Sequence, residues 1–387
     1  MADKLTPKFE LRVDGAPASA LAVASVIGIS CRQDLDMADA IEVRLSNDGL
    51  EWSDGDTFAE GKKLSVRMGF VETDLQTIVS GEIVRRECEF PQKGASVVTV
   101  VAFDREYRLK HGKKSRAFKD QKVCDVVKKL CSEAGLSAEV DDSKIKHKYL
   151  FQANQTNLEF IREHARRLGY VVQVDRDNAK VSFKKPATGT AKHVKLKWGV
   201  DLLSFRPRFS TDEQVEEVHV RGWDMHKKKH VTGKATPADV FSKMGGSRLG
   251  ADLAKKSFGK REVLYVDGLT VSDQDAGQLA KAYANSLLHR YAQGEASGQG
   301  NNKIVPGAVI EVLGCGKKAS GNYYVSSTLH HYEPRGYTTH FTFVRPSDTT
   351  AAPPPAKKAK PPPPPKATKL PEPPSLGATA QHGEGAT

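Results

Sequence analysis

Over roughly the first 110 residues, hydrophobic and polar side chains alternate along several short runs of the chain. Apolar positions two residues apart lie on one face of a strand, so this pattern predicts half-buried antiparallel strands. The clearest runs are Phe9 to Val13, Ile41 to Leu45 and Leu64 to Phe70. Strands of this kind must cover their apolar face, most simply by curling into a small barrel or sandwich. We therefore expect a first β-barrel at residues 1–110.

The periodicity changes beyond residue 110 and predicts an α/β module at residues 111–186. In the stretch Leu150–Asp175, Thr156 followed by Glu159 is typical of a capping box, in which each side chain binds the backbone of the other residue. Gly169 supplies the left-handed residue that ends the predicted helix. The helix has one apolar stripe, made of Leu158, Ile161, Ala165 and Leu168.

Alternation returns from about residue 193 and continues to the hairpin Tyr323–Val344. Residues 232–260 interrupt it with Gly, Lys and Ala and no strong period, and a helix capped by Ser272 follows. We therefore expect a second β-barrel at residues 193–346 with a helical insertion around residues 232–300. The fold class is then mainly β with α+β insertions, in which two antiparallel β-barrels flank an α/β module.

Residues 347–387 have a different composition from the rest of the chain. The run PPPAKKAKPPPPPKATKLPEPP has too few apolar side chains for a core and favours polyproline II. We predict a disordered Pro/Lys-rich tail, which could be a tether, a docking peptide or a plain spacer.

Three stretches of the chain support a family resemblance. Leu150–Asp175 contains Q-x-x-x-T-x-x-x-F-I-x-x-x-x-x-x-x-G-Y, and Val218–Lys228 contains V-x-G-W-D-x-x-x-K. Gly321–Val344 is a closing hairpin. In this order and spacing, the stretches resemble the late control protein D and VgrG-type family of baseplate hubs, which belong to contractile phage tails and contractile injection systems. The chain is most similar to the stand-alone hub without a fused needle.

The resemblance implies a structural hub and a set of partners. In this family each chain of a homotrimer contributes two barrels similar to the tail-tube subunit, so three chains present six barrels in a ring. Such a ring adapts a hexameric inner tube to a trimeric spike. The implied partners are two further copies of the chain, the inner tube subunit, a spike or tip protein and other baseplate proteins. The implied location is the bacterial cytoplasm during assembly, and then a phage virion or an extracellular injection particle.

The candidate residues have structural or interaction roles. We expect Gln152, Thr156, Glu159 and Gly169 to fix the α/β module, Gly222, Trp223 and Asp224 to form a turn of the second barrel, and Tyr323 and Tyr337 to lie in a hairpin that packs or lines the ring.

Composition bears on three features of the protein: a nucleic-acid partner, a membrane anchor and disulfide bonds. The 387 residues carry a net charge of +12, with basic clusters at 110–116, 227–230 and 255–261. These clusters fall in predicted loops and lack interleaved aromatic residues, which argues against nucleic acid as a partner. No run approaches the ~20 apolar residues of a membrane helix, and the N-terminus lacks a secretory apolar region, so we expect no membrane anchor. The five cysteines are scattered and odd in number, which favours free thiols.

No motif in the sequence predicts catalysis, a cofactor or a metal. Walker-type, dinucleotide-binding, H-E-x-x-H, paired C-x-x-C and G-x-S-x-G patterns are all missing. His330 and His331 are neighbours on a predicted strand and so point to opposite faces, which argues against a shared metal. We therefore predict a protein that is not an enzyme. Two alternatives stay open: a baseplate-associated cell-wall hydrolase, which needs two carboxylates across a cleft, and a basic nucleic-acid-binding protein, whose affinity would depend steeply on salt.

Overall fold

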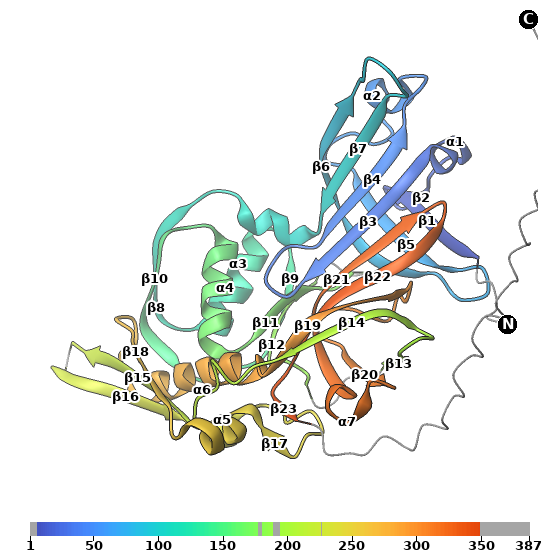
Figure 1. Cartoon of the computed structure of the whole chain (residues 1–387). Coiled ribbons are helices and arrows are strands. Elements are labelled where there is room, and N and C mark those ends of the chain that lie inside the picture. The colour runs from blue at the N-terminus through green and yellow to red at the C-terminus, as the bar shows by residue number, and fades with distance from the viewer. Residues whose placement is uncertain (1–5, 177–179, 189–193, 226, 349–387) are drawn as a thin grey trace, which may run out of the picture. The chain divides into compact units, whose positions relative to one another are not determined.

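A branched, mainly antiparallel sheet of 13 strands is the main feature of the fold. The computed structural model describes residues 6–176, 180–188, 194–225 and 227–348. The expectation of a mainly β fold with α+β insertions is confirmed, since helices occur chiefly in two places between the strands of this sheet. Figure 1 shows the sheet passing from the blue N-terminal strands into the orange and red C-terminal hairpin.

The first β unit supplies one half of the large sheet. Its six main strands are β1 (Pro7–Val13), β3 (Val26–Asp34), β4 (Ala40–Ser46), β5 (Lys63–Phe70), β6 (Gln76–Glu89) and β7 (Val97–Phe103). The alternating apolar residues face inward as predicted, and Leu11, Ile41, Val43 and Leu64 are all buried. Three short elements complete the unit: β2 (Ala16–Pro17), α1 (Ala20–Ala24) and α2 (Glu51–Asp54).

The second β unit supplies the other half of the sheet. Its strands are β13 (Val194–Lys197), β14 (Leu202–Phe209), β19 (Ala292–Gln299), β20 (Val309–Leu313), β21 (Gly321–Glu333) and β22 (Gly336–Arg345). Helix α7 (Gly316–Ala319) joins β20 to β21, and a separate cluster of buried side chains fills this unit. Strands β3 and β21 pair, so one sheet runs through both units. The division of the chain into three domains therefore stays an interpretation.

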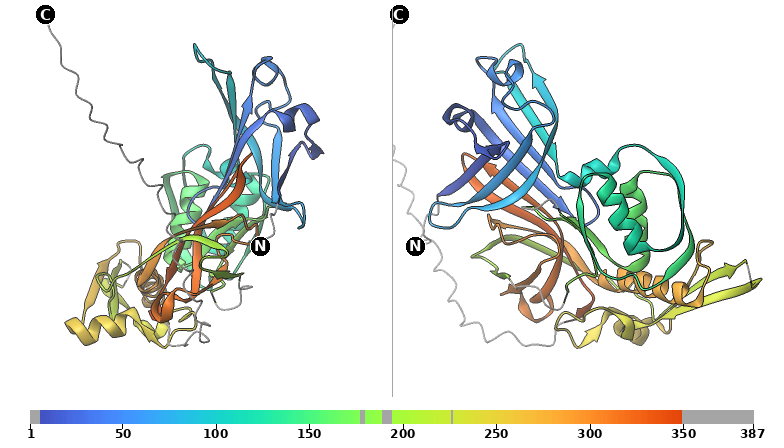
Figure 2. Two further views of the ribbon diagram at one scale, coloured as in Figure 1. Left: turned by 45° about the vertical axis from the view of Figure 1, so that its right-hand side comes forward. Right: turned by 180° about the vertical axis from the view of Figure 1, so that it is seen from behind.

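The α/β module follows the 3-10 helix η1 (Arg105–Lys110). It consists of β8 (Lys114–Lys122), α3 (Val123–Glu133), β9 (Ser137–Val140), β10 (Lys146–Gln155), α4 (Asn157–Leu168), β11 (Val171–Val174) and β12 (Lys180–Lys184). The ribbon β8–β10 curves around the two helices, which is clearest in the rear view of Figure 2. The predicted apolar stripe of α4 is buried, as are Val126, Val127 and Leu130 of α3.

The insertion in the second β unit begins and ends earlier in the chain than the predicted range of 232–300, since β19 at 292–299 belongs to the large sheet. It contains β15 (Glu217–Asp224), β16 (Lys229–Ala235), η2 (Pro237–Asp239), β17 (Arg248–Leu249), α5 (Gly250–Phe258), β18 (Glu262–Val266) and α6 (Asp273–His289). Strands β16, β15 and β18 form a sheet of their own that packs on α6. The assignment of β15 to the second barrel is therefore wrong. Its period of two shows only that it is a half-buried strand, and many sheets can accept such a strand.

Ordered structure continues two residues into the predicted tail. Ser347 and Asp348 form β23, which pairs with β17, and Ser347 is fully buried. The predicted disorder of the rest of the tail lies outside the described residues.

Candidate assembly interface

The two β units have the same strand order. Numbered one to six along the chain, the strands of each unit lie in the order 2-3-6-5-4-1: β3-β4-β7-β6-β5-β1 in the first unit and β14-β19-β22-β21-β20-β13 in the second. The one difference is that β13 runs parallel to β20, whereas β1 runs antiparallel to β5. The sequence predicts two β units but shows no residue-level repeat, so only the structure reveals that their strand order is the same.

Irregularities of the strands repeat as well. The pairing of β6 with β7 shifts by one residue between Ile83 and Arg85, and that of β21 with β22 shifts between Val325 and Ser327. Just before each shift, a glycine with positive φ donates a backbone hydrogen bond: Gly61 to Ile83 over 2.8 Å, and Gly307 to Val325 over 2.9 Å. Because the bulges and the left-handed glycines lie at equivalent points, the residues of the two units can be aligned one by one.

The junction between the units is an antiparallel pairing of β3 with the second half of β21. Ile29–Asp34 lies opposite Tyr332–Ser327, and Figure 1 shows the two strands side by side. Ser30 Oγ lies 2.9 Å from His331 Nδ1 across the pair. Tyr337 from β22 enters the core of the first unit, where its ring centroid lies 5.7 Å from that of Phe70. The junction therefore has both a backbone ladder and a shared core.

The same kinds of edge occur a second time without a strand partner among the described residues. Strand β14 is the last strand at its end of the sheet. Strand β5 pairs with β6 only from Gln76 to Glu82. The β6 backbone beyond Ile83 therefore has a strand on the β7 side alone. Unpaired edges of this kind can accept a strand from another chain.

Both tyrosines of the predicted hairpin are buried and have packing roles. Tyr323 donates a hydrogen bond of 2.7 Å to the Ala319 carbonyl, and the Arg345 guanidinium lies 4.4 Å from the centre of its ring. The hydroxyl of Tyr337 lies 2.9 Å from Nδ1 of His330, whose Nε2 lies 3.1 Å from the Ile304 carbonyl. Burial lowers the pKa of His330 to about 3, so this imidazole is neutral. His331 is on the opposite strand face, as predicted.

The predicted residues of the α/β module act as local determinants of its structure. The capping box is confirmed: Glu159 N donates to Thr156 Oγ1 over 3.1 Å, and Thr156 N donates to a Glu159 carboxylate oxygen over 2.8 Å. Gly169 ends α4 at a φ of +68°. Gln152 is fully buried, and its side chain accepts from Arg116 over 2.9 Å while donating to the Gln155 carbonyl over 2.9 Å.

Gly222, Trp223 and Asp224 do not form a turn of the second barrel, so this prediction is wrong. They end β15 in the separate sheet of the insertion, where Asp224 Oδ1 accepts a 3.0 Å hydrogen bond from the Lys227 amide. A Cβ on Gly222 would lie 2.2 Å from the Thr270 carbonyl oxygen, so only glycine lets that loop approach the strand. Sequence spacing could not show this long-range contact.

Arg167 of α4 holds the loop before α6 against the α/β module. Its guanidinium donates to Asp267 over 2.7 Å and to Thr270 over 3.1 Å. Nearby, Gln278 of α6 donates to the Leu168 carbonyl over 3.0 Å. No signal in the sequence marks Arg167 for this role, because its position on the polar face of α4 is typical of solvated charge.

A cavity of about 420 Å³ is lined by several carboxylates, among them Asp39, Asp104 and Glu106. Burial raises the pKa of Asp39 to about 6 and raises the pKa values of Asp104 and Glu106. Each group also has a structural partner. Asp104 caps η1, Glu106 forms a 2.8 Å ion pair with Arg162, and Asp39 accepts a 3.0 Å hydrogen bond from Gln33.

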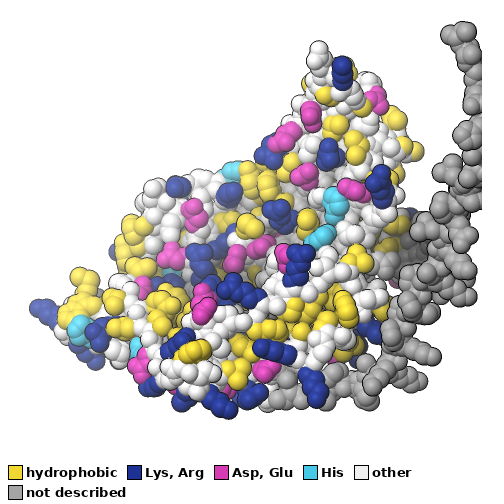
Figure 3. Space-filling model, viewed as in Figure 1, with side chains coloured by type: hydrophobic (Ala, Val, Ile, Leu, Met, Phe, Trp, Pro, Cys, Tyr) yellow, Lys and Arg dark blue, Asp and Glu magenta, His cyan; other side chains and the backbone are white. Residues whose placement is uncertain are grey.

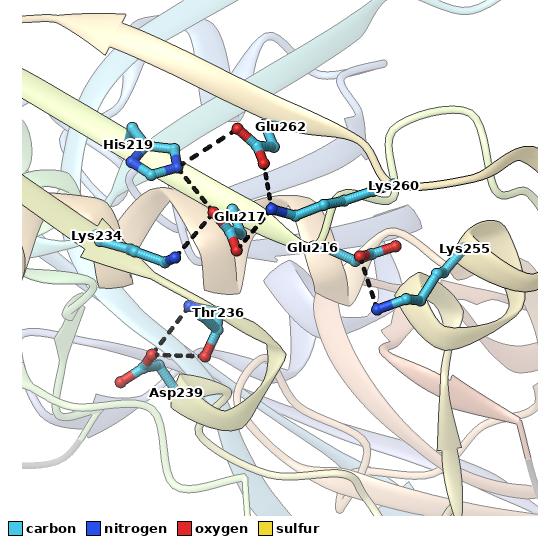
Figure 4. A network of polar contacts seen from close by, with 9 residues as sticks. All are labelled: Glu216, Glu217, His219, Lys234, Thr236, Asp239, Lys255, Lys260 and Glu262. Carbon is cyan, nitrogen blue, oxygen red and sulfur yellow. Dashed lines mark hydrogen bonds and ion pairs between the residues drawn. The ribbon is translucent and has the colours of Figure 1, made fainter.

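Among the described residues, one group has the composition and spacing of a metal site: Glu217, His219 and Glu262, whose ligand atoms lie within 4.8 Å of one another. Figure 4 shows two lysines directed at the same carboxylates. Lys234 Nζ lies 2.9 Å and Lys260 Nζ 3.0 Å from Glu217, and Lys260 also pairs with Glu262. These hydrogen bonds lower the pKa of Glu217 to about 2. The lysines already balance the carboxylate charge, so the geometry fits a network that ties three strands together better than a metal site.

The basic clusters are only partly in loops, which corrects the prediction. Residues 114–116 lie in β8, 229–230 in β16 and 255–258 in α5. Several of their side chains have acidic partners, such as Lys255 with Glu216 at 3.1 Å and Arg116 with Glu133 at 2.8 Å. On the face shown in Figure 3, basic side chains are interspersed with acidic and apolar ones. This distribution gives little support to a nucleic-acid groove.

The helices and the cysteines can be compared with the expectations of no membrane anchor and of free thiols. Within the part of the chain that the structure describes, helices are too short or too polar to cross a membrane. All five cysteines are free, in agreement with the prediction; Cys88 is exposed, Cys315 is partly buried and the other three are buried.

The fold matches solved structures of phage tail proteins. The 43 kDa tail protein of prophage MuSo2 from Shewanella oneidensis matches 88% of this chain and 99% of its own length, with a TM-score of 0.65 and 13% identity. A tail protein from Neisseria meningitidis matches 88% of this chain and 97% of its own, with a TM-score of 0.62 and 12% identity. A type VI secretion component of E. coli matches 89% and 79%, with a TM-score of 0.59 and 11% identity. The chain therefore has the fold of phage tail and type VI secretion proteins.

The chain belongs to the family described as the Alg8 N-terminal domain, whose model matches residues 9–333. No curated protein matches the chain. The resemblance to tail proteins is thus confirmed at the level of fold. Membership of the late control protein D family itself stays a prediction.

Proposed function

We propose that this chain is the structural hub of a baseplate in a contractile phage tail or a phage-like injection system. Three copies would form a ring of six β units that accepts a hexameric inner tube on one face and a trimeric spike or tip protein on the other. The chain acts by binding and is not an enzyme. It would be assembled in the bacterial cytoplasm and would function in a virion or an extracellular injection particle.

One observation supports the proposal above all others: two β units of the same strand order are joined edge to edge by β3 and β21. A ring of six like units built from three chains needs this arrangement. The contact between the two units of one chain must be equivalent to the contact between units of neighbouring chains. The edges of β14 and β6 are then available for the contacts between chains. A closed ring pairs every such edge, whereas a single chain leaves two exposed. The fold of tail proteins agrees with this role.

The α/β module and the insertion would have a supporting role outside the ring. Arg167 joins them through Asp267 and Thr270, and Gln152 and the capping box hold the module itself together. We expect these residues to position surfaces for other baseplate proteins.

The absolute mass of the full chain tests this function. We would measure it by light scattering, alone and with the tube and spike proteins of the same genome. A threefold mass, or a monomer that becomes three copies per particle with its partners, is the expected result. A chain that stays monomeric with both partners present would overturn the proposal.

A cell-wall hydrolase is the second candidate, because Asp39 and Glu106 line one cavity and burial raises the pKa values of both. Carboxylates of this kind occur at catalytic sites as well as in structural networks. Release of soluble fragments from peptidoglycan by the native chain, and its loss in Glu106→Gln, would support hydrolysis. If no fragments are released, the buried Glu106 carboxylate has only the structural role that its ion pair with Arg162 gives it.

A further inference from the structure

The junction between the two β units identifies the strands that two copies of the chain would use. In the junction, Ile29–Asp34 lies opposite Tyr332–Ser327. The repeated strand order and the equivalent bulges assign a counterpart to each segment. Residues 205–210 in the second unit correspond to 29–34, and residues 85–90 in the first unit correspond to 327–332.

We propose that residues 205–210 of one copy add as an antiparallel strand to residues 85–90 of a second copy, in the register of the intrachain junction. The inference rests on the proposed function, since it names the surface through which copies of the hub associate. The register follows from the intrachain pairing. Ser327 faces Asp34 within the chain, so Arg85 faces Ser210 between copies. Each following residue of 85–90 then faces the preceding residue of 205–210, as far as Phe90 opposite Phe205.

Charges match on one face of the proposed pairing. Glu87 lies opposite Arg208, and Glu89 lies opposite Arg206. Directly opposite charges of unlike sign stabilise a strand pair. In the single chain, two of these side chains form ion pairs with exposed partners: Arg206 pairs with Glu295, and Glu87 pairs with Arg85. Both contacts are weak enough in solvent to be exchanged on association.

The other face of the pairing has two pairs without charge and one arginine, Arg86, which lies opposite Phe209 and donates to the Gly55 carbonyl in the single chain. Phe90 lies opposite Phe205, and Cys88 lies opposite Pro207. Phe90 is 62% exposed and Cys88 is exposed in the single chain. His330, the intrachain counterpart of Cys88, is fully buried. Association of two copies would bury the exposed residues in the way that the intrachain junction buries theirs.

Pro207 limits the ladder but does not prevent it. Proline is tolerated on an edge strand when its missing N–H faces away from the existing partner. The outer edge of β14 therefore lacks one donor, and the pairing has one hydrogen bond fewer than its intrachain counterpart. An edge with a missing donor also pairs less readily with unrelated strands.

Each copy has one edge of each kind, so association is head to tail. Contacts of this type form a ring if the rotation closes and a filament if it does not. The light-scattering mass of the assembly gives the number of copies at which the ring closes.

The native Cys88 makes the register testable by disulfide formation. Directly opposite residues of antiparallel strands have Cα atoms ~4.5–5.5 Å apart, which suits a disulfide. We expect Pro207→Cys in the full chain to form linked dimers and higher multiples on mild oxidation, visible on a non-reducing gel and lost on reduction. Pro207→Cys with Cys88→Ser should form none, which excludes links through the other four cysteines.

Two further variants control for register and for folding. Arg206→Cys puts a thiol on the opposite sheet face and should not link to Cys88. Should Pro207→Cys fail to fold, Glu87→Cys with Arg208→Cys in a Cys88→Ser background replaces it and should link. Reversed charges give an independent check: Glu87→Arg and Arg208→Glu should each weaken association several-fold, and the double variant should restore it.

The outcomes separate this inference from the proposed function. A threefold mass, together with specific links between Cys88 and the thiol introduced by Pro207→Cys, supports both. A threefold mass without those links overturns the strand pairing and leaves the hub function. A monomer with both partners present overturns the hub function, and absence of links then overturns the pairing too.

Discussion

Single residues in this chain hold segments together that are far apart in the sequence. Arg167 connects α4 to the loop before α6, and Tyr337 extends from the second β unit into the core of the first. Neither has a local pattern that marks it. A polar residue on an exposed-looking helix face and a tyrosine on a strand both have ordinary local explanations, and only their distant partners reveal their roles.

Replacement of Asp39 by asparagine should change the pH dependence of stability. Burial raises the pKa of Asp39 to about 6 in the folded chain, against ~3.9 in an unfolded one. The folded state therefore binds more protons between these values, so the contribution of Asp39 to stability falls as pH rises from about 4 to about 7. Asparagine does not titrate.

The unfolding free energy of Asp39→Asn, compared with wild type by urea denaturation, should therefore rise between pH 4.5 and 7.5 by roughly 1–3 kcal/mol. A difference that is the same at both pH values would show that the Asp39 carboxylate does not lose solvation on folding.

Gly222→Ala should destabilise the insertion. The added Cβ would lie 2.2 Å from the Thr270 carbonyl oxygen, so the loop must move. Overpacking of this kind costs about 1–3 kcal/mol. The matched control is Gly277→Ala in α6, where a Cβ meets nothing within 4 Å and helix propensity favours alanine by roughly 0.5–1 kcal/mol. Thermal unfolding should show opposite shifts for the two variants, and equal shifts would contradict the contact.

At the scale of elements, local signals in the sequence are reliable where the element is self-contained. The capping box and Gly169 fix both ends of α4 through contacts within a few residues. The helix predicted to begin after Ser272 is also present, with the Ser272 side chain as its cap. Elements whose stability depends on distant partners are harder to predict. Helix α5 lies within the stretch of weak periodicity at 232–260, and β16 overlaps its start.

Ile161→Asp should prevent folding of the α/β module. Ile161 is fully buried in the core of the module, and an unpaired carboxylate there costs several kcal/mol. The variant should be insoluble or lack a cooperative transition. Arg166→Asp introduces the same side chain at an exposed position of the same helix and should remain soluble. A soluble Ile161→Asp chain with native unfolding would contradict the packing of α4.

At the scale of the whole molecule, the fold is a duplication joined by one strand pair. Sequence periodicity predicts two β units, and the resemblance to baseplate hubs predicts that they are alike. The equivalence of their registers, and the strands that join them, follow from backbone hydrogen bonds that have no side-chain signature.

Removal of residues 351–387 should leave the folded body unchanged. Their Pro- and Lys-rich composition cannot form a core, and the buried clusters consist of residues before 346. The truncated chain should have the same unfolding midpoint by circular dichroism as the full chain. Loss of a single cooperative transition on truncation would show that the tail contributes to the core.

The sequence by itself determined the local elements, their buried faces and the presence of two β units around an α/β module, because these depend on periodicities and caps that lie within a few residues. Tertiary structure alone decided that β15 leaves the second barrel, that Gly222 meets Thr270, and that β3 joins β21. The physical reason is that an alternating strand specifies which face it buries but not which edge it pairs with. Backbone donors and acceptors are the same in every strand, and the choice among edges depends on the packing of the whole chain.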